Sequence, residues 1–182
     1  DVPVVGGNVS LYNEHGDGAI DPTPVISMVG LIDKAESVTR SFVTKSGQCI
    51  LLLGGLPHEL GGSYFLQTEY GKKEGTCPKV DFEAEKKIQD FLIQKIDQGA
   101  ISAAHDIAEG GLLVALAEML FERPELGVEL SIDSLGNSNR LDALLFGESQ
   151  GRVLISVSNE NLDQVLESAM QDGLPVMKLG TS

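Results

Sequence analysis

The side chains best suited to bind a ligand lie near the beginning of the chain. A β-branched run at residues 2–5 predicts a strand, which ends at the pair Gly6 and Gly7. Glycine lets backbone N–H groups approach a phosphate closely, and nearby side-chain oxygens suit a hard cation. The same composition is typical of a hairpin-type turn whose polar side chains satisfy local backbone groups, so both interpretations stay open. The candidate oxygen ligands are on Asn8, Ser10, Asn13 and Glu14.

A second glycine pair, Gly110 and Gly111, precedes an Ala/Leu-rich segment in the middle of the chain. That segment, residues 111–121, is apolar nearly all round and predicts a deeply packed helix. The glycines are suited either to a ligand at the helix start or to close packing of the helix on a strand. Packing is the favoured interpretation, because glycine, amide and hydroxyl groups converge instead within residues 7–10.

A polar triplet, Glu148, Ser149 and Gln150, stands between glycines just before a predicted strand. It is suited either to hydrogen-bond a small ligand or to cap and turn the chain. His15 has no metal-ligand partner at a helical or strand spacing, and His58 lies in a glycine-bounded loop. Both histidines are therefore predicted to be exposed to solvent.

Composition narrows the possible functions. The chain has 182 residues, of which 27 are acidic and 13 basic, giving a formal charge of −14. This charge disfavours nonspecific binding to nucleic acid or anionic membranes, and an anionic ligand would need backbone N–H groups, hydroxyls or a cation. No apolar run reaches the roughly 18 residues of a membrane span. Cys49 and Cys77 form no CxxC motif, which indicates reduced thiols in the cytosol.

The elements expected to position these residues alternate between strands and helices after about residue 48, which predicts a layered α/β domain of the α+β class. The polar segment 15–18 is expected to be a loop. The chain begins and ends beside predicted strands, so we expect it to be a piece of a longer protein. The run at residues 25–32 is expected to be buried on both faces, and the helix 81–98 is indicated by an apolar stripe that includes Phe82, with Asp81 as N-cap and Gly99 after its end. The predicted strands are residues 2–5, 25–32, 48–53, 101–104, 127–132, 152–157 and 175–179, and the predicted helices are 63–69, 81–98, 111–121 and 159–171.

Three stretches taken together resemble the second half of phosphoribosylformylglycinamidine synthase. Residues 3–14 read PVVGGNVSLYNE and are followed by PTPVI at 22–26, residues 102–112 read SAAHDIAEGGL, and residues 146–152 read FGESQGR. Order and approximate spacing agree along essentially the whole chain. The first stretch is the most specific of the three, because its twelve residues are uninterrupted.

The resemblance implies an ATP-dependent C–N ligase of de novo purine biosynthesis in the cytoplasm. ATP activates an amide oxygen of formylglycinamide ribonucleotide, and glutamine-derived ammonia displaces phosphate to give the amidine. The implied cofactors are ATP and Mg²⁺. The implied partners are the ribonucleotide, a glutaminase subunit or domain and a small accessory subunit, with no nucleic acid and no membrane. The isolated chain is expected to be inactive, because the family's catalytic histidine and most magnesium carboxylates lie in the first half.

The resemblance also assigns domains and site residues. Residues 1–34 correspond to the end of the second N-terminal-type domain, which holds the ATP and substrate site. Residues 35–182 correspond to the second C-terminal-type domain, of the aminoimidazole ribonucleotide synthetase type and truncated at its end. By position, Gly7 resembles an ATP contact, Asn8 a magnesium ligand and Ser10 a substrate contact. No catalytic residue is assigned.

Other motifs are left out of the predicted site. The triplet at residues 148–150 corresponds to a copy that faces a pseudo-symmetric, non-catalytic site, and whether it lines a structural nucleotide site stays open. His105 and Asp106 are left out as well. Gly6 stands where the family often has serine, but residues 7–10 keep the family pattern.

Two further hypotheses compete with this one. A sister enzyme, such as aminoimidazole ribonucleotide synthetase, selenophosphate synthetase or thiamine-phosphate kinase, is disfavoured because residues 8–14 resemble the amidine-forming family specifically. A non-catalytic scaffold, binding a structural nucleotide or docking the glutaminase, is supported by the small number of titratable site candidates. Nucleotide binding at residues 148–152, with none at 7–10, would favour the scaffold.

Overall fold

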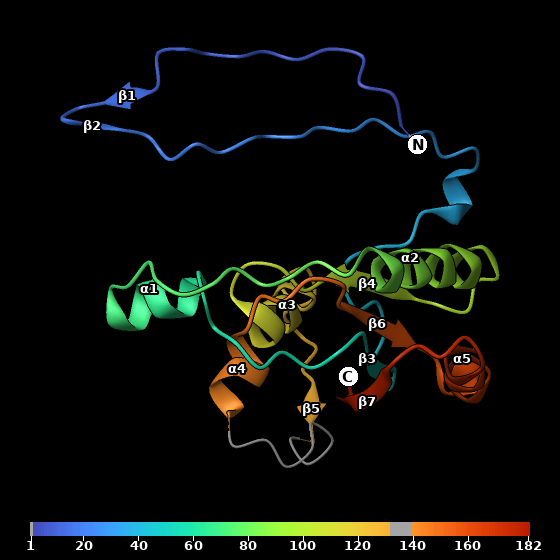
Figure 1. Cartoon of the computed structure of the whole chain (residues 1–182). Coiled ribbons are helices and arrows are strands. Elements are labelled where there is room, and N and C mark those ends of the chain that lie inside the picture. Colours follow the sequence, from blue (N-terminus) through green and yellow to red (C-terminus); the bar gives the residue numbers. More distant parts are fainter. Residues whose placement is uncertain (1, 132–139) are drawn as a thin grey trace. The chain divides into compact units, whose positions relative to one another are not determined.

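A computed structural model describes residues 2–131 and 140–182 (Figure 1). The chain divides into two units between Leu31 and Ile32. The first unit contains a short antiparallel hairpin of β1 (Glu14–His15) and β2 (Gly18–Ala19). Its two-residue turn begins at Gly16, where φ is +59°, so glycine takes the position that favours it in a tight hairpin. The polar segment predicted as a loop is therefore the turn of a hairpin.

The rest of the first unit, residues 2–13 and 20–31, has no helix or strand. The prediction of a strand at residues 25–32, buried on both faces, is wrong: Val25 is 88% exposed and Val29 is 97% exposed. The predicted strand at residues 2–5 is also not formed. An apolar β-branched run favours a strand, but the strand exists only when a neighbour supplies backbone partners.

The second unit is built on a five-stranded sheet with the order β4-β6-β3-β7-β5, in which every neighbouring pair is antiparallel. The central strand, β3, pairs with both β6 and β7. The strands are β3 (Cys49–Leu53), β4 (Ala103–Asp106), β5 (Glu129–Leu130), β6 (Val153–Val157) and β7 (Val176–Thr181).

Helices pack against both faces of this sheet and form a hydrophobic core on each (Figure 1). Side chains alternate along a strand, so Ile50 and Leu52 of β3 join one core and Leu51 and Leu53 join the other. The first core includes α3 and α4, and the second includes α2 and α5. The predicted α+β class with layered helices and sheet is confirmed. The helices are α1 (Tyr64–Tyr70), α2 (Phe82–Asp97), α3 (Gly111–Glu118), α4 (Leu141–Phe146) and α5 (Asn159–Gln171), with a 3₁₀ turn, η1 (Ala35–Ser37).

Local signals placed α2 correctly. The Asp81 carboxylate accepts hydrogen bonds from the backbone N–H groups of Glu83 and Ala84 at 3.1 Å, as an N-cap does. Gly99 follows the helix with φ of +66°. Phe82, predicted to lie on the apolar stripe, is 80% exposed, because it belongs to the first turn, beyond the part of the helix that covers the core.

Other boundaries differ from the predictions. β4 starts two residues later than the predicted strand, and α3 ends at Glu118 rather than at residue 121. The strand predicted at 127–132 is present only at Glu129–Leu130, and Ile132 lies outside the described residues. β6, β7 and α5 lie close to their predicted positions.

The glycine at the start of α3 is required by packing. Gly111 has φ of +76°, and a Cβ built on it would lie 2.6 Å from the carbonyl carbon of Phe146 at the end of α4. Any side chain here would be strained by the backbone conformation and by contact with neighbouring backbone. The close approach of α3 to α4 therefore depends on this glycine.

Replacing Gly111 with alanine tests this requirement. We expect Gly111→Ala to lower the free energy of unfolding by roughly 2–5 kcal/mol, the sum of a left-handed backbone and overpacking. The matched control is Gly173→Ala, where φ is +67° but a Cβ would meet nothing within 4 Å. The control should lose only about 1–2 kcal/mol. Urea denaturation measures both, and equal losses would contradict the packing argument.

Candidate functional site

The predicted ligand residues Gly7, Asn8 and Ser10 lie in an extended, exposed part of the first unit. Gly6 and Gly7 are not among the glycines with positive φ, so they do not form the left-handed part of an anion-binding nest, and no turn is assigned at these two residues. A Cβ on Gly7 would meet nothing within 4 Å. Neither the backbone conformation nor the packing of this chain therefore requires glycine at that position.

Hydrogen bonds link Ser10 to the residues that follow it. The Ser10 hydroxyl donates to the carbonyl oxygen of Tyr12 at 3.2 Å, and the Asn13 side-chain amide donates to the Ser10 carbonyl oxygen at 2.8 Å. The hydroxyl proton is committed to Tyr12, so the lone pairs of Ser10 Oγ remain to accept a hydrogen bond. Within the described residues, the Asn8 side chain makes no hydrogen bond, which leaves its carbonyl oxygen open.

In the second unit, Glu148 caps two helices. Its Oε1 accepts from the backbone N–H of Tyr64, the first residue of α1, at 2.8 Å, and from that of Gly110, which precedes α3, at 2.9 Å. The first N–H groups of a helix lack partners within the helix, and a carboxylate satisfies them well. Of the two roles predicted for the polar triplet, Glu148 therefore has the capping role.

Ser149 is also occupied by a bond within the chain. Its hydroxyl donates to Glu59 Oε1 at 2.6 Å. This hydrogen bond is the main reason that the pKa of Glu59 lies below its ordinary value, and the N–H of His58 and the charges of His58 and Arg152 act in the same direction. Of the triplet, Gln150 has an exposed side chain that faces cavities.

Arg152 is buried beside this loop, with only 3% of its surface exposed. Its guanidinium donates to the carbonyl oxygens of Ser149 and Gly147, and Nη1 has no partner among the described residues. Burial lowers the pKa of Arg152 to about 10, partly offset by the charge of Glu59. Sequence reasoning missed this residue, and it left capping as one of two interpretations for Glu148. A charged residue at the start of an apolar strand was the available signal for Arg152.

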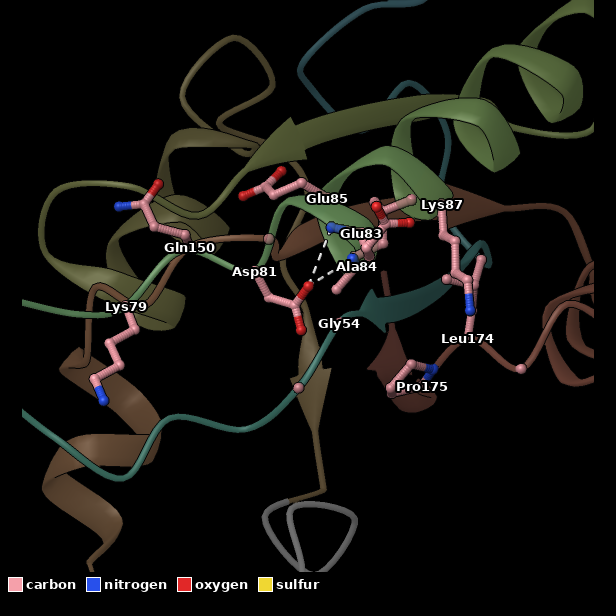
Figure 2. A pocket seen from close by; sticks show the side chains of 14 residues that line it. Gly54, Lys79, Asp81, Glu83, Ala84, Glu85, Lys87, Gln150, Leu174 and Pro175 are labelled. Carbon is pink, nitrogen blue, oxygen red and sulfur yellow. Dashed lines mark hydrogen bonds between the residues drawn. The ribbon is translucent and has the colours of Figure 1, made fainter.

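A cavity of about 360 Å³ opens at the start of α2 (Figure 2). Figure 2 shows the Asp81 carboxylate bonded to the first turn of the helix, with Glu83 and Glu85 close by. The capped N–H groups of Glu83 and Ala84 are no longer available to an anionic ligand. The lining of the cavity also carries three carboxylates and only two lysines, so its net negative charge disfavours binding of a phosphate. The charged residues of the lining are Lys79, Asp81, Glu83, Glu85 and Lys87.

The middle of the chain contributes packing. Gly110 has φ of +80°, and a Cβ on it would lie 2.5 Å from a methyl group of Val114. Together with Gly111, it fits the packing interpretation of the glycine pair.

His105 is half-buried, with Nδ1 2.7 Å from the Asp106 carbonyl oxygen and Nε2 3.5 Å from a Glu118 carboxylate oxygen. His15 and His58 are exposed, as predicted.

Residues 2–131 and 140–182 contain no group of three or more His, Cys, Asp or Glu side chains placed to hold a metal ion. In the same residues, no helix is both long and apolar enough to cross a membrane.

Comparison with known proteins identifies the family. Residues 45–182 match the family described as "AIR synthase related protein, C-terminal domain". The chain belongs to this family. The matched range begins just before β3 and includes the whole five-stranded sheet.

Curated relatives and solved structures extend the similarity. The chain is 42% identical over 179 residues to phosphoribosylformylglycinamidine synthase subunit PurL of Caldanaerobacter subterraneus subsp. tengcongensis, a match over 98% of this chain and 24% of the relative. The chain therefore spans about a quarter of the length of the curated relatives it matches. Two solved structures of T. maritima PurL each match 81% of this chain at 22% identity. The complex with FGAR has a TM-score of 0.66, and the match covers 26% of that chain. The complex with ATP has a TM-score of 0.62, and the match covers 23% of that chain.

These findings confirm the resemblance to phosphoribosylformylglycinamidine synthase and the fold of the C-terminal type. The solved structures support the fold, since their sequence identity is low. The roles of Gly7, Asn8 and Ser10, and the assignment of residues 1–34 to a different domain type, stay predictions.

The capping role of Glu148 predicts a loss of stability. Glu148→Ala removes the acceptor of two helix-start N–H groups, so we expect the free energy of unfolding to fall by roughly 1–3 kcal/mol. The neighbouring variant Gln150→Ala is the matched control, since its side chain is exposed, and it should change stability by less than about 0.5 kcal/mol. Urea denaturation of both variants checks this. Equal stability of Glu148→Ala and wild type would exclude the capping role.

The hydrogen bond from Ser149 to Glu59 should make the stability of the fold depend on pH. A lowered carboxylate pKa adds stability above the ordinary pKa of glutamate, and this contribution is lost as the pH falls through the pKa of the folded state. Ser149→Ala removes the main cause, so the pKa of Glu59 should rise toward its ordinary value. Carboxyl NMR titration measures it. Asp142, whose pKa is lowered chiefly by its hydrogen bond with Arg140, should stay unchanged as the control.

Proposed function

We propose that this chain forms part of a phosphoribosylformylglycinamidine synthase. The complete enzyme would convert formylglycinamide ribonucleotide, ATP and glutamine-derived ammonia to the amidine, ADP and phosphate. The observation that carries the proposal is 42% identity to a synthase subunit over 98% of this chain. Since the match covers 98% of this chain, it also includes residues 7–10.

Three residues would contribute to the ATP and substrate site. Gly7, which nothing in this chain's own packing requires to be glycine, would let its backbone approach the nucleotide. Asn8 would ligate magnesium through its open carbonyl oxygen. Ser10 would contact the ribonucleotide, and its lone pairs are suited to accept from a ribose hydroxyl or an amide N–H.

Magnesium fits Asn8 only as one ligand of several. Mg²⁺ prefers octahedral oxygen ligands and is usually held by carboxylates, waters and substrate phosphates. Asn8 supplies one neutral oxygen, and the described residues hold no cluster of carboxylates or imidazoles around it. When bound, the ion would offset the repulsion between a polyphosphate and a chain of charge −14. The remaining ligands would come from other parts of the complete enzyme.

The exposed apolar side chains of the first unit support its assignment to a separate domain. Val4, Val5 and Leu11 are each more than 90% exposed, as are Val29 and Leu31. Apolar side chains this exposed within one segment are suited to packing against another part of the complete protein. We propose that residues 1–34 are the end of the domain that holds the active site, and that 35–182 are the C-terminal-type domain that follows it.

The same proposal includes the partners and the compartment. A glutaminase subunit or domain would supply ammonia, and a small accessory subunit would join the assembly. A cytoplasmic location suits the two free cysteines, because thiols stay reduced there. The chain by itself would be inactive, since it carries three binding residues and no assigned general base.

The test uses the full-length protein that contains this chain, with ammonia as the nitrogen donor. Wild type should release ADP only when formylglycinamide ribonucleotide is present. Asn8→Ala should raise the magnesium concentration needed for half-maximal rate by roughly tenfold or more, since loss of even an outer-shell partner of a metal typically costs that much. Thr23→Ala, in the same unit and without an assigned role, is the control.

Two results would overturn the proposal. ADP release that depends on another ribonucleotide or on selenide or thiamine phosphate would identify a sister enzyme. An unchanged magnesium dependence in Asn8→Ala would remove Asn8 from the metal site.

A further inference from the structure

We infer that Asn13 is a positioning residue for Ser10, and this inference rests on the proposed function. Asn13 lies at the junction between the hairpin and the segment that carries the predicted ligand residues. Its side-chain amide donates to the Ser10 carbonyl oxygen at 2.8 Å, which is within the normal range for an N–H···O hydrogen bond. The bond closes a turn over residues 10–13.

The hairpin holds Asn13 in place from the other side. The Asn13 carbonyl oxygen accepts from the Ile20 N–H at 3.0 Å, and the register continues with Glu14 opposite Ala19. Backbone pairing thus fixes the main chain of Asn13, and the Asn13 side chain extends that order to Ser10. Within the described first unit, residues 2–9 make no comparable link to the hairpin.

The turn also sets the direction of the Ser10 hydroxyl. The hydroxyl donates to the Tyr12 carbonyl oxygen at 3.2 Å, which lies inside the turn that Asn13 closes. Without the Asn13 bond, only the hydrogen bond from Ser10 to Tyr12 would hold this turn, so the hydroxyl would be less well ordered. Ordering Ser10 before the substrate arrives lowers the entropic cost of binding.

Asn13→Asp tests the inference in the full-length enzyme with ammonia as the nitrogen donor. Aspartate has the size of asparagine, but its carboxylate cannot donate to the Ser10 carbonyl and repels it. We expect KM for formylglycinamide ribonucleotide to rise by roughly two- to tenfold, the range of one lost neutral hydrogen bond, while KM for ATP stays unchanged. Asn13→Ala, which removes the donor without adding a charge, should act in the same direction.

A double-mutant cycle separates positioning from a general structural effect. Because Asn13 acts through Ser10, adding Asn13→Asp to Ser10→Ala should raise KM no further. Thr23→Val is the matched control: it removes a comparable side-chain bond, from Thr23 to the Asp21 carbonyl at 3.3 Å, and should leave KM at the wild-type value.

The outcomes distinguish the two proposals. If Ser10→Ala raises KM for the ribonucleotide and both Asn13 variants leave it unchanged, the positioning role is overturned and the proposed function stands. If the Asn13 and Ser10 effects add in full, the positioning role is likewise overturned. If Ser10→Ala itself leaves KM unchanged, the predicted substrate contact fails, and the inference fails with it.

Discussion

The second unit depends on the burial of its central strand. Every residue of β3 is buried, and the strand pairs with β6 on one side and β7 on the other. Backbone groups removed from water need partners, so a strand this apolar is stable only between two neighbours. Its alternating side chains then have to be covered on both faces, and α3 with α4, and α2 with α5, supply those two layers.

Polar residues around this core serve mainly to end helices and turn the chain. Glu148 satisfies N–H groups at the starts of α1 and α3, and Arg152 donates to the carbonyl oxygens of Gly147 and Ser149 after α4. A charged residue so used is not free to bind a ligand, because the ligand would have to displace bonds that hold the fold. The polar triplet therefore contributes one open side chain, Gln150, rather than three.

The sequence predicted those features that depend on local signals. The spacing of apolar residues, with Asp81 before it and Gly99 after it, was enough to place α2, and an apolar run was enough to place β3. The run at residues 25–32 is just as apolar but forms no strand, because pairing depends on a neighbour that a local pattern does not show. For Glu148 the sequence offered capping as one of two roles, but the groups it caps could not be predicted, since they are 84 and 38 residues away in the chain.

The predicted site residues take no part in the packing that stabilises this chain. Gly7, Asn8 and Ser10 are exposed, whereas the residues of β3, α3 and α5 that form the two cores are buried. Substitutions in the first set should therefore change binding with little effect on unfolding, because they remove no buried area and no capped N–H group. Substitutions at Gly111 or Glu148 act in the opposite way, through the fold. Asn13 belongs with the first set, since it is exposed and its bond to Ser10 stays within the first unit. Binding and stability in this chain are thus carried by different residues, and mutations can address them separately.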